Sequence, residues 1–168
     1  SEINYWDEVR RSFDLPKKVQ FHDATLRDGE QTPGVVFRKN EKVKIAKKLS
    51  EIGVERIEAG MPAVSAEDAE AIREIVSLGL PAKIMAFSRT IPKDIDYAVE
   101  CGVWGVVLEI PSGEARMKYQ FGWTEDQVVE RSVTGIKYAK DRGLFVNFFP
   151  YDTTRARLSF LERLISEV

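Results

Sequence analysis

The sequence contains very few of the residues that build metal clusters or disulfides, since its 168 residues include one cysteine and one histidine. The single cysteine, Cys101, excludes a disulfide framework within the chain and any zinc cluster that needs several sulfurs. Because Cys101 stands just before a glycine at a predicted helix end, we interpret it as a small packed residue rather than a nucleophile.

The sequence also lacks a charge excess and long apolar runs. The formal net charge is -2, and the 31% of charged residues mix both signs. Nothing in this distribution indicates a nucleic-acid or anionic-membrane partner. The apolar runs, such as 106–108 and 144–146, are far shorter than the roughly 20 residues that span a bilayer, and charged residues occupy the place of a signal core. We therefore expect a cytoplasmic protein that binds small molecules, with no nucleic acid and no membrane partner.

Five short β-rich runs alternate with longer segments of helical spacing. The runs are 19–21, 56–59, 83–87, 106–110 and 145–149. Several are apolar on both alternating faces, as expected for parallel strands that are covered by helices on one side and a packed core on the other. The pattern predicts repeated βα units in an α/β fold.

The segments of helical spacing end at glycines, which suit the left-handed position after a helix. These glycines are Gly53, Gly79, Gly102 and Gly143. Helix starts are also visible, because Ser65 with Asp68 and Thr124 with Gln127 have the spacing of capping boxes. Residues 158–168 add a fifth amphipathic helix.

Repeated βα units are compatible with an open doubly wound sheet and with a closed (β/α)₈ barrel. A barrel needs eight strands and roughly 200 residues or more, so five units would be only its first part. Residues 1–18 carry apolar side chains on one helical face and predict an N-terminal helical segment ahead of the βα units of 19–168.

The most informative stretch is 22–34, a polar segment directly after the first predicted strand. Ligands of parallel α/β folds bind at the carboxyl ends of strands, which is where Arg27, Asp28 and Gln31 fall. Gly29 lets the chain turn so that Arg27 and Asp28 both face the barrel mouth. An arginine can stabilise an oxyanion or enolate, and an aspartate can bind Mg²⁺ or Mn²⁺. The alternative interpretation is an ordinary ion pair on a polar loop.

The string TLRDGEQTPG resembles the signature of the metal-dependent Claisen-condensing synthases, which include the 2-isopropylmalate, homocitrate and citramalate synthases. These enzymes share a barrel superfamily with the hydroxymethylglutaryl-CoA lyases. The resemblance continues through 55–62, Arg89, 94–96, Asp152 and Arg155, and so covers nearly the whole chain from Val19 onward. It implies a (β/α)₈ TIM barrel of which this chain holds about the first five βα units.

The resemblance implies a role for each matching residue. Arg27 would polarise the substrate carbonyl and stabilise the enolate, and Asp28 would bind a divalent metal (Mg, Mn or Zn). Glu58 and Tyr151 would be the other catalytic residues. Asp23 would support these residues without contacting the substrate or metal itself. The expected substrate-binding residues are Gln31, Arg89, Asp152 and Arg155. Among these, Arg89 would grip the carboxylate of a 2-oxo acid bidentately.

The implied reaction is a Claisen-type condensation. The enolate of an acyl-CoA attacks the keto carbon of a 2-oxo acid that is bound to the metal, and thioester hydrolysis then drives the reaction forward. A general base must remove the α-proton of the acyl group.

The sequence departs from the family pattern at three places. The His-x-His pair that completes the metal site is absent; because neighbours on a strand face opposite sides, we expect the lone His22 to pack towards the helices rather than to bind metal. Tyr151 replaces a common glutamate, which favours the lyase branch. The loop 111–123 lacks the usual synthase pattern, and we expect it to select the substrate, with a solvated loop as the alternative.

Three hypotheses about function follow: an acyl-CoA:2-oxo acid C-acyltransferase, a C–C lyase or aldolase on the same scaffold, and a non-catalytic half-barrel scaffold. We favour a chain that continues beyond Val168 over a second chain that supplies the remaining strands. The first and fifth strands would be unpaired edges, and exposed edges associate. We therefore expect a homo-oligomer, or association with the missing half of the barrel.

Overall fold

The computed structural model describes residues 6–7, 11 and 16–168. The helical segment predicted over 1–18 falls largely outside the described residues. In the part of the chain that is described, no helix is long and apolar enough to cross a membrane. Cys101 is 3% exposed and packs in the core, as its place in the sequence predicts.

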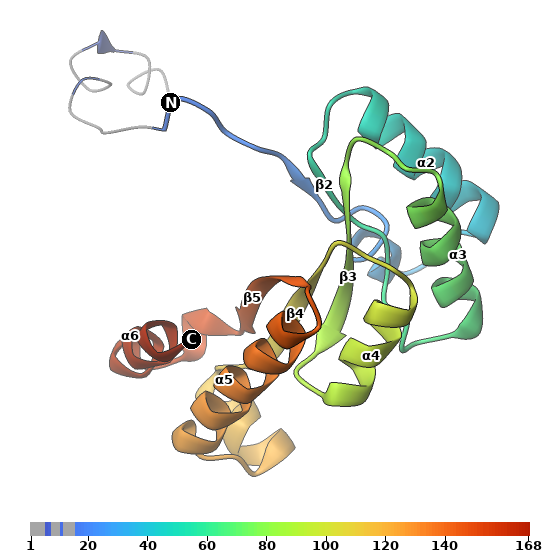
Figure 1. Cartoon of the computed structure of the whole chain (residues 1–168). Coiled ribbons are helices and arrows are strands. Elements are labelled where there is room, and N and C mark those ends of the chain that lie inside the picture. Colours follow the sequence, from blue (N-terminus) through green and yellow to red (C-terminus); the bar gives the residue numbers. More distant parts are fainter. Residues whose placement is uncertain (1–5, 8–10, 12–15) are drawn as a thin grey trace.

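Five parallel strands form one sheet in the order β1-β2-β3-β4-β5. They are β1 (His22–Asp23), β2 (Arg56–Glu58), β3 (Lys83–Arg89), β4 (Gly105–Pro111) and β5 (Phe145–Tyr151). The spatial order follows the chain without the reversal of an open doubly wound sheet, and the sheet curls as a barrel wall does (Figure 1). The prediction of a partial (β/α)₈ barrel with five βα units is confirmed.

Five helices follow the strands, and α2 to α5 lie along the outer side of the curled sheet (Figure 1). They are α2 (Lys39–Glu51), α3 (Ala66–Ser77), α4 (Pro92–Glu100), α5 (Glu125–Asp141) and α6 (Leu158–Glu167). Three short helical turns occupy the connections at the carboxyl ends of strands: η2 (Gly29–Gln31), η3 (Arg116–Phe121) and η4 (Thr153–Arg155). η3 is a π-helix, so the loop predicted over 111–123 has a helical turn of its own.

The predicted helix ends are confirmed, and so is one of the two predicted capping boxes. All four helix-ending glycines have positive φ angles, namely Gly53, Gly79, Gly102 and Gly143. Thr124 and Gln127 form a reciprocal capping box at the start of α5. At the start of α3, Ser65 accepts a bond from the Asp68 amide, but the Asp68 carboxylate bonds elsewhere, to Lys42 and to the Met61 amide. The prediction there is half correct.

The first strand lies later than predicted, at His22–Asp23 instead of 19–21. Val19 and Phe21 are more than two-thirds exposed, although the Phe21 carbonyl still accepts the Arg56 amide. The apolar run therefore leads into the strand but does not form its buried part.

Apolar side chains pack on both faces of the sheet. The larger cluster joins the outer face to α2–α5 and includes Ile57, Ile72 and Leu108. On the inner face Met85, Phe87 and Val107 form a smaller cluster. Since side chains two residues apart on a strand share a face, the inner face continues into polar residues at the carboxyl ends: Glu58, Arg89, Glu109 and Tyr151. The candidate site is built on this inner face.

Candidate active site

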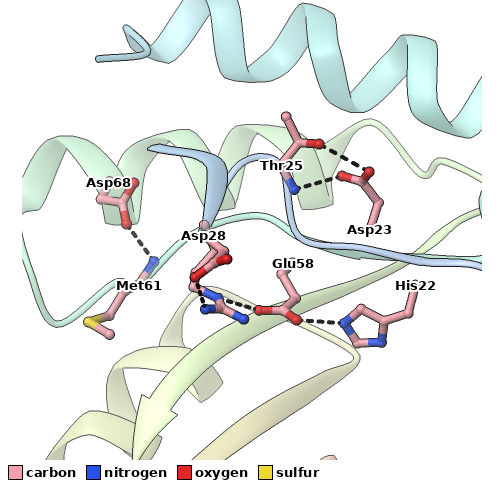
Figure 2. A network of polar contacts seen from close by, with 8 residues as sticks. His22, Asp23, Thr25, Asp28, Glu58, Met61 and Asp68 are labelled. Atoms are coloured by element: carbon pink, nitrogen blue, oxygen red, sulfur yellow. Dashed lines mark hydrogen bonds and ion pairs between the residues drawn. The ribbon is translucent and has the colours of Figure 1, made fainter. Parts of the chain in front are cut away.

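A tight turn after β1 presents Arg27 and Asp28. The carbonyl of Ala24 accepts the amides of Arg27, Asp28 and Gly29 at 2.8–3.2 Å. Asp23 fixes the start of the turn, because its two carboxylate oxygens accept the amide and the hydroxyl of Thr25 (Figure 2). Leu26, in the middle of the turn, is fully buried and anchors it to the core.

Glu58 on β2 holds the guanidinium of Arg27. The Nε of Arg27 donates to Oε2 of Glu58 at 2.6 Å, and the two side chains are 10% and 6% exposed. The other Glu58 oxygen, Oε1, contacts Nε2 of His22 at 2.8 Å (Figure 2). The prediction that His22 packs towards the helices is wrong: in register with Arg56, its ring lies on the same side of the sheet as Glu58.

Aromatic rings support the same guanidinium from the sheet. Its central carbon lies 4.4 Å from the ring centre of Phe87 on β3 and 5.9 Å from that of Phe149 on β5. Nη1 of Arg27 donates to Oδ1 of Asp28 at 2.9 Å. Asp28 is 66% exposed at its side chain, so its second oxygen is open to a ligand. Arg27 is thus fixed in place, whereas Asp28 is accessible.

Glu109 also belongs to this site, although it is not among the residues predicted from the sequence. It lies near the carboxyl end of β4, in register between Arg89 and Phe149. Burial raises the pKa of its carboxyl above the ordinary value, although the positive charges of Arg27, Arg116 and Arg89 oppose the shift. The clue in the sequence was an acidic residue inside an otherwise apolar strand, Val106 to Ile110.

Tyr151 ends β5 on the same inner face. Burial raises the pKa of its hydroxyl, and the negative charge of Glu109 adds to the effect. The guanidinium of Arg116 lies 5.4 Å from the ring centre. Tyr151 therefore stays protonated at neutral pH and can donate a proton or a hydrogen bond.

Asp152 and Arg155, predicted to bind substrate, bind each other. The Asp152 carboxylate is 8% exposed and pairs with Arg155, and it lies 3.9 Å from Nε of Arg116. Its backbone is left-handed, with φ at 62°. A Cβ at Gly113 would lie 2.1 Å from the Asp152 carboxylate, so this close approach requires glycine. In this arrangement Asp152 orients arginines, and Arg155 offers the exposed charge.

Arg89, predicted to grip a substrate carboxylate, instead makes a two-point contact within the chain. Its Nε and Nη2 donate to the buried Asp94 at 2.6 and 3.1 Å, while the Arg89 side chain is 58% exposed. Gln31 lines a cavity of about 560 Å³ together with Arg27 and Met61. Gln31 and Arg27 therefore line the same cavity, whereas Arg89 does not line it and is paired with Asp94.

The metal site predicted at Asp28 is not complete within the described part of the chain. Among residues 6–7, 11 and 16–168, no group of three or more His, Cys, Asp or Glu side chains is placed to hold an ion. His22 is bound to Glu58, and Asp23 is bound to Thr25. The described residues therefore do not by themselves fit a divalent metal, and Asp28 could supply one ligand at most.

Similar sequences carry the names of three synthases. Homocitrate synthase AksA of Methanopyrus kandleri is 44% identical over 160 residues, which are 95% of this chain and 40% of that protein. (R)-citramalate synthase CimA of Methanocaldococcus jannaschii is 46% identical over 89% of this chain and 30% of its own length. A probable 2-isopropylmalate synthase of Ignicoccus hospitalis is 42% identical over 92% of this chain and 39% of its own length. The chain spans less than half the length of these relatives.

Solved structures agree on the fold. The HMG-CoA lyase of Bacillus subtilis superposes with a TM-score of 0.73 at 16% identity, covering 92% of this chain and 55% of that chain. The hydroxymethylglutaryl-CoA lyase of Pseudomonas aeruginosa gives 0.72 at 22% identity, with the same coverage. At this identity the likeness concerns the barrel alone. Since residues 18–168 match the family described as HMGL-like, nearly the whole chain is covered, and the protein belongs to the HMGL-like family.

Proposed function

We propose that this chain is the first part of the catalytic barrel of an acyl-CoA:2-oxo acid C-acyltransferase, which carries out a Claisen-type condensation. The observation that carries the proposal is the fixed Arg27, which is bound to Glu58 at 2.6 Å beside an accessible Asp28 at the carboxyl ends of the strands. The synthase names of the relatives support the same chemistry. A cytoplasmic location and a bound divalent metal belong to this proposal.

The condensation places three demands on protein side chains. A base takes a proton from the α-carbon of the acyl-CoA, and the resulting enolate carbon forms a C–C bond with the keto carbon of the 2-oxo acid. The C=O electron pair moves to the keto oxygen, which then takes up a proton. Water finally cleaves the C–S bond, which releases the CoA thiol and a carboxylate. Base, oxyanion stabilisation and proton donor are the three roles to assign.

Arg27 fits the role of oxyanion stabiliser. The Nε of Arg27 donates to Glu58, and its Nη1 donates to Asp28. Within the described residues, Nη2 of Arg27 makes no hydrogen bond. A guanidinium held on two sides has lost its rotational freedom before substrate binds, so the stabilisation of developing charge needs no rearrangement.

Glu109 and Tyr151 fit the two proton-transfer roles. A carboxylate whose pKa is raised is a stronger base than an ordinary one, and Glu109 lies on the inner face beside Arg89. Tyr151 keeps its proton and can deliver it to the keto oxygen. Asp28, the proposed metal ligand, and the exposed Gln31 and Arg155 would contact the 2-oxo acid or the CoA ester.

A thiol-release assay tests the proposal. Acetyl-CoA is incubated with a panel of 2-oxo acids that have short, branched and carboxylate side chains, with Mn²⁺ present, and free CoA is measured. Arg27→Lys should abolish 2-oxo-acid-dependent release. Arg131→Lys is the matched control. The guanidinium carbon of Arg131, on α5, also lies over an aromatic ring, 4.3 Å from the ring centre of Trp123. The proposal would be contradicted if the chain showed no thiol release and calorimetry also detected no binding of any 2-oxo acid.

The second candidate is a C–C lyase of the same family, which Tyr151 favours because a protonated hydroxyl is in place near Glu109. Such an enzyme would cleave a 3-hydroxyacyl-CoA into an acyl-CoA and a carbonyl compound. Carbonyl release without condensation would support the lyase. If both assays are negative and the chain still binds neither substrate class, the non-catalytic scaffold is the remaining hypothesis.

A further inference from the structure

A second charged cluster lies next to the turn of residues 24–29 that presents Arg27 and Asp28, here called the signature turn. The cluster lies on the side of α2 and α3. Lys42 on α2 is 3% exposed, which is unusual for a lysine. Its Nζ binds Oε2 of Glu30 at 2.6 Å and Oδ1 of Asp68. Burial of an unpaired charge is strongly unfavourable, and here one ammonium group is shared by two carboxylates. Removing Lys42 would leave these carboxylates facing each other.

The remaining carboxylate oxygens of this cluster bind the backbone of two loops. Oε1 of Glu30 accepts the Phe37 amide at 3.0 Å. Oδ2 of Asp68 accepts the Met61 amide at 2.6 Å (Figure 2). The cluster therefore joins the segment after the signature turn to the loop between β2 and α3.

Gly60 shows how closely this loop is held. Its φ angle is +144°, and a Cβ there would lie 2.7 and 2.8 Å from the two Asp68 oxygens. The carboxylate thus occupies the space of a side chain at Gly60. The Asp68 side chain does not complete the capping box at Ser65 and instead contacts Lys42 and the Met61 amide. This choice indicates that the contacts with Lys42 and Met61 are the stronger ones.

The cluster and the proposed catalytic arginine meet at one cavity. Arg27, Glu30, Lys42, Gly60 and Met61 all line the space of about 560 Å³ described above. Glu30 follows Arg27 by three residues, and Gly60 follows Glu58 by two. The signature turn is consequently tied to the end of β2 at two points: by Arg27 to Glu58, and by Glu30 through Lys42 and Asp68 to Met61.

We propose that Lys42 is a positioning residue for Arg27: by fixing Glu30 against the β2–α3 loop, it sets the orientation in which Arg27 meets Glu58 and Asp28. The importance of that orientation for catalysis rests on the proposed acyltransferase function. The coupling between Lys42 and Arg27 does not, because it concerns the ligand-free chain.

NMR of the whole chain without ligands tests this coupling. The variants are Lys42→Met, the charge-conserving Lys42→Arg, and Lys48→Met as a matched control, since Lys48 is exposed on the same helix. Lys42→Met should lower the hydrogen-exchange protection of the Phe37 and Met61 amides at least tenfold and shift the Nε–H signal of Arg27. Lys42→Arg should restore much of both, and Lys48→Met should change neither.

An unchanged Arg27 signal in a folded Lys42→Met variant that has lost Met61 protection would overturn the proposal. If Lys42→Met does not fold, Glu30→Gln decides instead, because it leaves the Lys42–Asp68 pair in place. It should shift the Arg27 signal and expose Phe37 while Met61 stays protected; an unmoved Arg27 signal would overturn the proposal. Failure of the thiol-release assay would leave these results unaffected, so the two proposals are tested separately.

Discussion

Arg27 and Glu58 form a largely buried ion pair, with Nε and Oε2 separated by 2.6 Å. Glu58→Ala leaves the guanidinium without its main partner, and breaking such a pair costs about 3–5 kcal/mol. We expect Glu58→Ala to lose stability of this order in urea unfolding and Glu58→Gln to lose less, with both losing thiol-release activity. Glu51→Gln, at an exposed pair on α2, should behave like the wild type. Full activity in Glu58→Ala would contradict the role of Arg27.

The raised pKa of Glu109 predicts a pH-dependent stability. The folded chain keeps this proton to higher pH than the unfolded chain, in which the carboxyl has its ordinary pKa. The contribution of Glu109 therefore favours folding at low pH and is lost as pH rises through the raised pKa. Glu109→Gln should unfold at a higher denaturant concentration than the wild type at neutral pH, and the difference should shrink towards pH 4.

The exposed Glu114→Gln is the matched control for Glu109 and should leave the stability profile unchanged. In the activity assay Glu109→Gln should lose turnover while binding of the 2-oxo acid persists, as expected for removal of a base. If Glu109→Gln unfolds more easily than the wild type at neutral pH, the neighbouring arginines stabilise the Glu109 carboxylate. That result would contradict a raised pKa for Glu109.

Tyr151→Phe removes a hydroxyl and keeps the ring under Arg116. If the hydroxyl delivers a proton, turnover should fall by on the order of 100-fold with little change in unfolding temperature. Tyr119→Phe, in the 79% exposed position on η3, should change neither quantity. Equal rates for Tyr151→Phe and the wild type would remove Tyr151 from the mechanism.

Asp28→Asn should weaken Mn²⁺ binding in the presence of a 2-oxo acid, measured as free Mn²⁺ by electron paramagnetic resonance. A neutral amide is a poorer ligand for a hard cation than a carboxylate. Asp23→Asn is the comparison, because both Asp23 oxygens are engaged by Thr25, and it should weaken binding much less. Equal affinities in wild type and Asp28→Asn would place the ion elsewhere.

The open inner face predicts self-association. The two edges of the sheet are β1 and β5, and on β5 Phe145 and Phe149 are 39% and 38% exposed. Exposed edges and aromatic faces favour contacts between chains. Sedimentation velocity should show species larger than a monomer that increase with concentration. A compact monomer at all concentrations would contradict this prediction.

Sequence reasoning succeeded where the physical cause is local. Glycines after helices, the Thr124 capping box and the last four apolar strands each depend on a few neighbouring residues, and the structure has them as predicted. The turn around Arg27 was also visible, because its residues are adjacent in the chain.

Contacts between distant segments were not predictable in the same way. Asp68 had the spacing of a capping residue, yet Lys42, 26 positions earlier, draws its carboxylate away. The raised pKa of Glu109 comes from its burial on β4 between β3 and β5, which its position in the sequence does not show. Ion pairs between distant segments depend on how the strands and helices assemble, so the spacing of charged residues along the chain does not identify them.

The lone histidine gives this protein an internal reporter. His22 contacts the same carboxylate that holds Arg27, and the sequence contains no second imidazole. The ring protons of His22 therefore give histidine signals in a proton NMR spectrum that need no assignment by mutagenesis. Any ligand or substitution that moves Glu58 should change the His22 ring signals, which can be observed in unlabelled protein.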